Sequence, residues 1–256
     1  MAKFFYVSSL PRTGQTLLAS LLHQNSNICF TPQSHVLACL GGFSQFKTHN
    51  SIYNNFKTPV ALDRAVHAFR NKYYKEFTDA KYILERGPWA TPYNRNILAS
   101  FERKPKFIII YRPILEALAS LIKVEKPNLD LPVLTRCQHL LSPGGAFHQG
   151  LLSIQGSLKE DHIIIHYKDI VSKPKDTVKR IYDYMGLDFK GIRTTNLDQY
   201  QVKGIKYNDV LLNGFPHQNL HTIRTAKIKA RKYDYRDILP QSIIDQYKDS
   251  DILWGY

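Results

Sequence analysis

The chain has 256 residues, of which 43% are apolar, and carries a formal net charge of +14 with a pI of about 9.6. This length suits one large α/β domain with a sizeable core, and the apolar fraction excludes a disordered chain. The charge favours an anionic partner such as a nucleotide, a sulfated or phosphorylated substrate, nucleic acid or an acidic surface, although most lysines should lie on solvated helix faces.

The cysteines and the N-terminal segment indicate the cellular compartment in which the protein is expected. Cys29, Cys39 and Cys137 are odd in number and lack metal or redox spacing, which predicts reduced thiols of a cytoplasmic protein. The first apolar run ends at Pro11-Arg12 and is too short for a signal peptide or a membrane span. We therefore expect a cytoplasmic protein without a membrane span.

Strand and helix patterns alternate along the chain, which predicts an α/β fold with a doubly wound parallel sheet and helices on both faces. The predicted strands are residues 3–8, 28–31, 81–85, 107–111 and 162–167. The predicted helices are residues 15–24, 59–77, 92–102, 113–123, 133–141, 145–159, 174–185 and 240–247. Gly41-Gly42 and the polar stretch after them indicate a loop within residues 35–57. Without repeats or linkers, residues 1–256 are expected to form one domain.

The first informative motif is the loop that joins residues 3–8 to the next helix. At such a junction, free backbone N–H groups and the positive helix end converge and can bind an anion. Gly14 lets the backbone approach that anion, and Arg12 adds a planar cation. The hydroxyls of Thr13 and Thr16 add hydrogen-bond donors. The alternative is a plain strand–turn–helix with a surface arginine.

This loop resembles the nucleotide P-loop, G-x-x-x-x-G-K-[ST], with two departures. Ser9 stands at the first glycine position and Gln15 at the lysine position, while Gly14 and Thr16 match. Because the P-loop lysine neutralises the β- and γ-phosphates, its absence argues against ordinary ATP or GTP hydrolysis.

The second motif follows the apolar strand of residues 107–111. Arg112 ends that strand and Ser120 lies about two helical turns further on. Ligands of open parallel sheets bind beyond the carboxyl ends of the strands, so Arg112 could hold a phosphate. Alternatively, Arg112 pairs with a neighbouring carboxylate and Ser120 is a small helix-packing residue.

Together these motifs resemble the sulfotransferase family. Residues 11–18 resemble its 5′-phosphosulfate loop, and Arg112 with Ser120 resembles its 3′-phosphate site. Residues 162–170, Pro174 and residues 181–187 are similar to the strand–helix segment Y-E-D-L…P…F-L-G-L of the family. The motifs keep the family's order and cover roughly residues 3–190.

The resemblance implies a P-loop-like fold and sulfuryl transfer from 3′-phosphoadenosine 5′-phosphosulfate (PAPS) to a hydroxyl or amine, with the 3′,5′-bisphosphate PAP as product. By resemblance, the residues that hold the 5′-phosphosulfate are Arg12, Thr13, Gly14, Gln15 and Thr16. Arg112 and Ser120 would hold the 3′-phosphate, and Tyr167 would approach the adenine. No metal is implied, since no His, Asp or Glu cluster has ligand spacing.

Arg86 stands where family members often carry a lysine that contacts the transferring group. Arginine keeps the charge but cannot donate a proton, so its expected role is electrostatic. The alternative is an ion pair with Glu85 or Glu102.

The general base is expected near residues 31–35. Several relatives place a glutamate where this chain has Gln33, whose amide cannot accept a proton. His35 lies two residues on, on the same face of an extended segment, and imidazole titrates in a suitable range. We expect His35 to be the base, with Glu85, His221 or no side-chain base as alternatives.

Two further segments are assigned by the resemblance. Residues 203–236 hold eight Lys or Arg and two Asp, and relatives have a late loop that closes over the nucleotide. Arg224 and Lys227 could contribute there, unless the segment is simply a solvated basic stretch. Residues 35–80 match no family motif and are expected to form the acceptor side.

Other functions and the acceptor stay open at this point. A P-loop kinase or NTPase would release phosphate with Mg²⁺, and a basic nucleic-acid-binding protein would bind in a strongly salt-dependent manner. No nucleic-acid partner is expected, because no known binding module is recognisable. The acceptor could be a glycan, a protein tyrosine, a lipid or a small metabolite.

Overall fold

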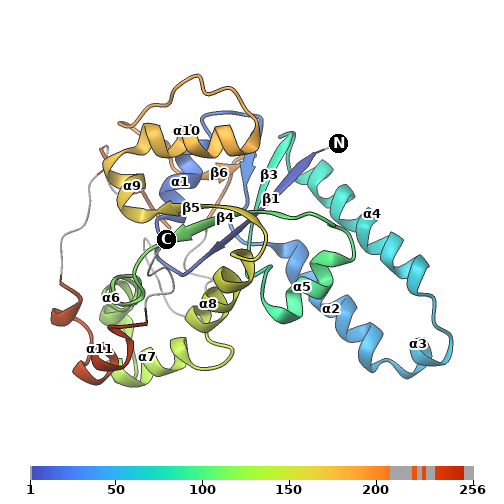
Figure 1. Cartoon of the computed structure of the whole chain (residues 1–256), viewed down its shortest axis with the longest axis horizontal. Helices are drawn as coiled ribbons and strands as arrows, with labels where there is room; N and C mark the ends of the chain where they lie inside the picture. The colour runs from blue at the N-terminus through green and yellow to red at the C-terminus, as the bar shows by residue number, and fades with distance from the viewer. Residues whose placement is uncertain (1, 208–220, 224–226, 229–233, 251–256) are drawn as a thin grey trace.

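A computed structural model describes residues 2–207, 221–223, 227–228 and 234–250. Its centre is a five-stranded parallel sheet in the order β2-β3-β1-β4-β5 (Figure 1). The strands are β1 (Lys3–Ser9), β2 (Ile28–Phe30), β3 (Tyr82–Arg86), β4 (Lys106–Tyr111) and β5 (Asp161–His166). This arrangement confirms the predicted α/β fold, and β1 lies in the middle with β3 and β4 as neighbours.

Helices cover the sheet and connect its parallel strands. They are α1 (Gln15–Leu22), α2 (His35–His49), α3 (Ser51–Asn55), α4 (Pro59–Phe77), α5 (Pro92–Ala99), α6 (Ile114–Glu125), α7 (Val133–Leu141), α8 (Ala146–Ser157), α9 (Tyr167–Ser172), α10 (Pro174–Met185) and α11 (Gln241–Tyr247). The hairpin strands β6 (Gln201–Val202) and β7 (Ile205–Lys206) lie between α10 and α11, and single 3-10 turns occupy Lys126–Asn128 and Tyr235–Asp237.

The apolar run of β4 shows how both faces of the sheet are buried. Ile108 and Ile110 join the cluster that includes α1, α2 and α10, whereas Ile109 joins a second cluster with α6, α7, α8 and α11. Alternate residues of a strand face opposite sides, so a continuous isoleucine run requires apolar cover on both. The helices therefore lie on both faces of β4, as the sequence predicted.

Small side chains bring α8 close to the end of β1. The Ser8 hydroxyl lies 2.7 Å from the hydroxyls of both Ser153 and Ser157. A Cβ on Gly150 would lie only 2.8 Å from the Ser9 carbonyl oxygen. This close packing fixes the strand end from which the first loop departs.

The prediction of a loop within residues 35–57 is wrong, because this segment forms the helices α2 and α3. The Ser34 hydroxyl caps α2 by accepting the Leu37 N–H at 2.8 Å, and Leu40 is buried further along the helix. Gly41 and Gly42 lie on the open side, where an added Cβ would meet nothing within 4 Å. Burial of the apolar face outweighs the low helix propensity of the two glycines.

Helices α2, α3 and α4 form an arm beside the β2 edge of the sheet, with α3 at its far end (Figure 1). The ring of Phe43 in α2 meets that of Phe69 in α4 at 6.2 Å between centroids. Within the described residues, no helix is both long and apolar enough to cross a bilayer.

Candidate active site

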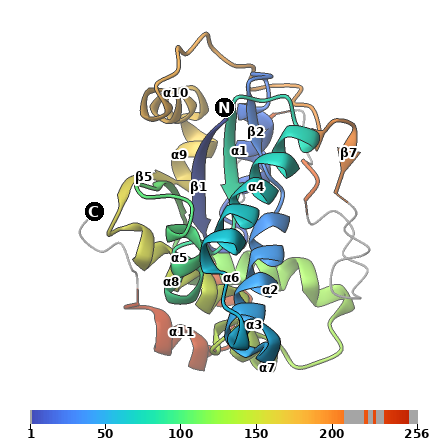
Figure 2. The ribbon, with the colours of Figure 1, turned by 90° about the vertical axis from the view of Figure 1, so that its right-hand side faces the viewer.

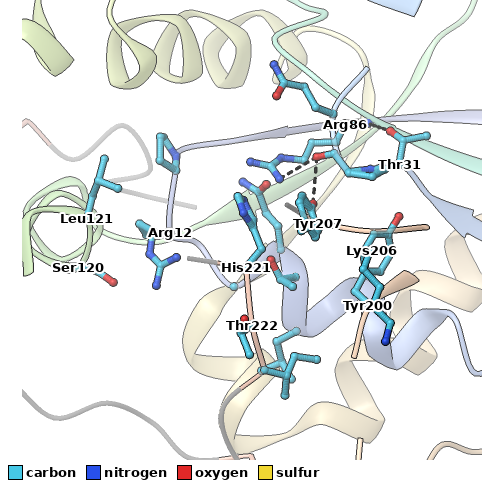
Figure 3. A pocket seen from close by; sticks show the side chains of 18 of the residues that line it. Arg12, Thr31, Arg86, Ser120, Leu121, Tyr200, Lys206, Tyr207, His221 and Thr222 are labelled. Carbon is cyan, nitrogen blue, oxygen red and sulfur yellow. Dashed lines mark hydrogen bonds between the residues drawn. The ribbon is translucent and has the colours of Figure 1, made fainter. Parts of the chain in front are cut away.

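The carboxyl ends of β1, β3 and β4 open into one cavity of about 820 Å³. Ten of the residues singled out in the sequence line it: Arg12, Gly14, Gln15, Thr16, Gln33, His35, Arg86, Arg112, Ser120 and Tyr167. Figure 3 shows Arg12 on the side of Ser120 and Leu121, and Arg86 beside Thr31 and Tyr207. Residues from distant parts of the chain thus meet at one edge of the sheet.

The loop after β1 presents backbone N–H groups to this cavity. Arg12 and Gly14 have left-handed backbones, with φ of 65° and 85°. Helix α1 starts at Gln15 without a side-chain cap, and its first backbone bond runs from the Leu18 N–H to the Gly14 carbonyl. The preceding N–H groups of the helix lack intrahelical acceptors, and such groups are able to bind an anion.

Tyr167 links the loop to the end of β4. A Cβ on Gly14 would lie 2.8 Å from the Tyr167 ring, and the Arg112 guanidinium lies 4.3 Å from that ring's centroid. Arg112 also donates to the Arg12 carbonyl at 3.1 Å and to Glu116 at 3.3 Å, and it is only 5% exposed. The expected carboxylate partner therefore exists, and the same arginine still lines the cavity.

Two polar side chains of the loop bond within it. Thr13 is fully buried, does not line the cavity and donates its hydroxyl to the Leu10 carbonyl at 3.1 Å. The Gln15 amide nitrogen donates to the same carbonyl at 2.8 Å and also contacts Ser9. The Thr13 hydroxyl therefore donates within the loop and does not point into the cavity.

Arg86 is anchored to the segment after β2. Its guanidinium donates to the Pro32 carbonyl at 2.9 Å, and its backbone N–H donates to the Thr31 hydroxyl at 2.9 Å (Figure 3). Neither Glu85 nor Glu102 comes within ion-pair distance of it, although all three residues are described. The ion-pair alternative for Arg86 is not what the structure shows.

The candidate bases differ in access to the cavity. His35 begins α2, lines the cavity and has Nδ1 3.1 Å from the Tyr73 hydroxyl. Glu85 is fully buried away from the cavity, its carboxylate accepts a hydrogen bond from Ser34, and burial raises its pKa to about 7. His221 also lines the cavity and stacks on Tyr207, with ring centroids 4.0 Å apart.

A sequence model of the sulfotransferase family matches residues 5–191, which is most of the chain. The chain belongs to the sulfotransferase family. This confirms the resemblance drawn from the three motifs, all of which fall within or beside the matched range. A search of curated proteins gave no match.

Several solved sulfotransferase structures are similar to this chain at low sequence identity. One from Alicyclobacillus acidocaldarius is 11% identical, with 78% of this chain and 85% of that chain covered and a TM-score of 0.51. A sulfotransferase domain from the curacin biosynthetic pathway is 14% identical. The match covers 99% of this chain and 93% of that chain, with a TM-score of 0.49. A mouse sulfotransferase complexed with PAP is 16% identical. The match covers 74% of this chain and 60% of that chain, with a TM-score of 0.45.

The cavity is strongly cationic. Among its described lining residues, five are cations, Arg12, Arg86, Arg112, Arg136 and Lys206, and Glu125 is the single carboxylate. Glu125 of α6 and Arg136 of α7 form a two-bond fork, with both N–O distances 2.8 Å. Nothing in the sequence indicated this pair, because two helices bring it together.

Residues beyond β6 also line the cavity, among them Lys206, Tyr207 and His221. The Gln199 amide holds Ile223 by bonding its carbonyl at 2.6 Å and its N–H at 2.9 Å. Lys227 pairs through its backbone with Thr195 and is not among the lining residues. Arg224, the other basic residue expected here, lies outside the described residues.

Proposed function

We propose that this protein transfers a sulfuryl group from PAPS to a hydroxyl or amine of an acceptor. The observation that supports it most is the shared cavity of Arg12 and Arg112, which come from the ends of different strands. The Arg112 guanidinium donates a hydrogen bond of 3.1 Å to the backbone carbonyl of Arg12. The donor carries anionic groups at two ends, and two fixed cations beside an uncapped helix suit it.

In this proposal, the first loop holds the 5′-phosphosulfate through Arg12, the backbone of Thr13 and Gly14, and the first turn of α1 with Gln15 and Thr16. Arg112 and Ser120 hold the 3′-phosphate. Ser120 is 4% exposed and lies on the same cavity wall as Leu121. Tyr167, fixed between Gly14 and Arg112, offers a ring edge or face to the adenine.

PAPS supplies an electrophilic sulfur and a leaving phosphate. Arg86 and Arg12 stabilise negative charge on the sulfuryl oxygens and on the departing phosphate oxygen. His35 accepts the proton of the acceptor hydroxyl as the new oxygen–sulfur bond forms and the sulfur–phosphate oxygen bond breaks. The Tyr73 hydroxyl at Nδ1 orients the imidazole, which leaves Nε2 for the acceptor.

We assign the acceptor side to the segment 35–80, and the closing role to the segment 203–236. The first assignment is supported by His35, Tyr73 and Phe77, which line the cavity from α2 and α4. The second is supported by Lys206 and Tyr207, which line the cavity, and Arg224 and Lys227 would add positive charge to this segment.

Calorimetry with PAP tests the donor site. We expect Arg112→Ala and Ser120→Ala to weaken PAP binding by about tenfold or more, since charge-assisted bonds contribute about 1.5–3 kcal/mol. Arg103→Ala is the matched control, because Arg103 is exposed and does not line the cavity. Absence of PAP binding by the wild type, or equal binding by Arg112→Ala, would refute the proposal.

The assignment of the base is tested with labelled PAPS and an active acceptor. His35→Gln should lower kcat by at least about a hundredfold and abolish the acidic limb of the pH–rate profile. His221→Gln should keep that limb. The reverse pattern would assign the proton transfer to His221.

A further inference from the structure

One row of aromatic rings runs along α4 and leads to the cavity. Phe69, Tyr73 and Phe77 are spaced by four residues and share one face of the helix. Successive ring centroids are 6.3 and 5.5 Å apart, and the rings of Tyr73 and Phe77 are stacked. Phe43 of α2, 40% exposed, adds a fourth ring 6.2 Å from Phe69. We name these four residues the aromatic track.

The track borders a second hollow that adjoins the active-site cavity. This hollow, about 620 Å³, lies on α4 and is lined by Ala68, Phe69, Lys72, Tyr73, Glu76 and Phe77. Tyr73 and Phe77 also line the large cavity, so the two spaces share a wall. The Tyr73 hydroxyl reaches His35 on the cavity side. In Figure 2, α2 and α4 both run down the same side of the molecule toward α3.

The chemistry of the hollow excludes most acceptor classes. Its floor is aromatic and aliphatic, and its two charged residues, Lys72 and Glu76, pair with each other at 2.7 Å. A glycan or peptide would bury polar groups there without partners, which costs about 1–3 kcal/mol for each group. An uncharged hydrocarbon chain needs no partners and loses water-exposed apolar surface.

The length of the aromatic track also fits an extended alkyl chain. Phe69 and Phe77 are separated by eight residues, which is about 12 Å along a helix. An extended chain of about ten carbons, with C–C bonds of about 1.5 Å, spans that distance.

We propose that the acceptor is a long-chain alcohol whose alkyl chain lies along the aromatic track while its hydroxyl enters the cavity beside His35. The transfer step rests on the proposed sulfotransferase activity, whereas binding of the chain does not. The chain enters from the Phe43 side of the arm, and Tyr73 and Phe77, which line both spaces, mark the passage into the cavity.

The binding test uses n-alkanols from butanol to decanol as competitors of the neutral dye Nile red. In the wild type, each added methylene should raise alkanol affinity by about three- to fourfold until the track is filled. Ala68→Trp fills the hollow from an exposed helix position and should remove this length dependence. Ala61→Trp, exposed on the same helix but lining neither space, should keep it.

Turnover of the same alkanols with labelled PAPS, and PAP calorimetry on each variant, separate the two proposals. We expect kcat/KM to rise with chain length in the wild type and Ala61→Trp, and to stay flat in Ala68→Trp. Length-dependent dye displacement without PAP binding would refute the sulfuryl transfer and leave the track intact. Displacement that is absent, independent of length, or unchanged by Ala68→Trp would overturn the track, whatever the PAP result.

Discussion

At the scale of single residues, Glu85 and Arg86 show how neighbouring residues of β3 face the core and the cavity. Adjacent strand residues face opposite sides, so Arg86 reaches the cavity while Glu85 enters the core. Burial is the main cause that raises the Glu85 pKa to about 7, and the hydrogen bond from Ser34 and the charge of Arg70 act in the opposite direction. This carboxyl therefore holds its proton in mildly acidic solution.

We predict that Glu85 makes stability fall as the pH rises from about 4.5 to 7. Below its usual value of 4.5 the group is protonated in both the folded and unfolded chain, and above about 7 it is ionised in both. Between these values only the folded protein holds the proton, so the wild type should lose about 3 kcal/mol relative to Glu85→Gln. Urea unfolding of both proteins at pH 4.5, 6 and 8 measures this difference.

The control for this prediction is Glu76→Gln. Glu76 is exposed and its pKa is lowered, chiefly by its hydrogen bond with Lys72, so its small effect should have the opposite sign. A Glu85→Gln protein whose stability difference from the wild type is independent of pH would contradict the assignment.

At the scale of elements, Gly156 illustrates a close helix-to-loop contact. A Cβ there would lie 1.9 Å from the Ala90 carbonyl oxygen, a backbone atom that cannot move away alone. Gly→Ala in a helix normally stabilises by up to about 1 kcal/mol, but overpacking costs about 1–3 kcal/mol. Gly156→Ala should therefore destabilise the protein, as measured by urea unfolding.

Gly41 provides the opposite case on α2, where an added Cβ meets nothing within 4 Å. Gly41→Ala should stabilise the protein by about 0.5–1 kcal/mol. If both variants shift the unfolding midpoint in the same direction, packing at Gly156 is not the deciding factor.

Gly14 carries a second element-scale prediction, because its substitution adds a clash to backbone strain. Gly14 and Gly144 have φ of 85° and 88°, but only Gly14 has a neighbour, the Tyr167 ring, within 4 Å of an added Cβ. Gly144→Ala should cost only the left-handed strain of about 1–2 kcal/mol. Gly14→Ala should cost more and also weaken PAP binding in calorimetry, and equal effects would contradict the role of Tyr167.

Local signals explain which parts of the site were predictable from the sequence. Apolar runs, Gly14 and the prolines set the strand ends and helix starts, so Arg12 and Arg112 could be expected at one edge of the sheet. Helix α2 was missed because Gly41 and its neighbour mask an apolar face. The inward Thr13 hydroxyl, the Arg136 fork and the stacked His221 arise from tertiary contacts that no local pattern encodes.

At the scale of the whole molecule, charge and fold are arranged together. Residues 1–62 contain no Asp or Glu, and they include the first loop, β2 and α2. Arg12, in the first loop, therefore has no carboxylate near it in the sequence, whereas Glu116 and Glu125 of α6 pair with Arg112 and Arg136. A positive field of this kind raises the local concentration of anionic ligands without adding to the stability of the fold.

The three thiols permit a test of whether this fold opens as one unit. Cys29 belongs to the core cluster around α1 and α10, and Cys137 belongs to the cluster of α6, α7 and α8. Burial raises the pKa of each of these two thiols to about 11, so both should be inert to alkylation in the native protein. Cys39, exposed on α2, should react at once.

We predict that Cys29 and Cys137 lose their protection with the same free energy of opening as urea increases. Strand β4 contributes to both clusters, with Ile108 and Ile110 in one and Ile109 in the other, so neither layer can separate without exposing the other's apolar surface. Alkylation followed by mass spectrometry gives the two opening energies, and rapid labelling of Cys39 confirms that the reagent is active. Opening energies that differ by more than about 1 kcal/mol would show instead that the layers unfold separately, because one cooperative transition gives every buried group the same value.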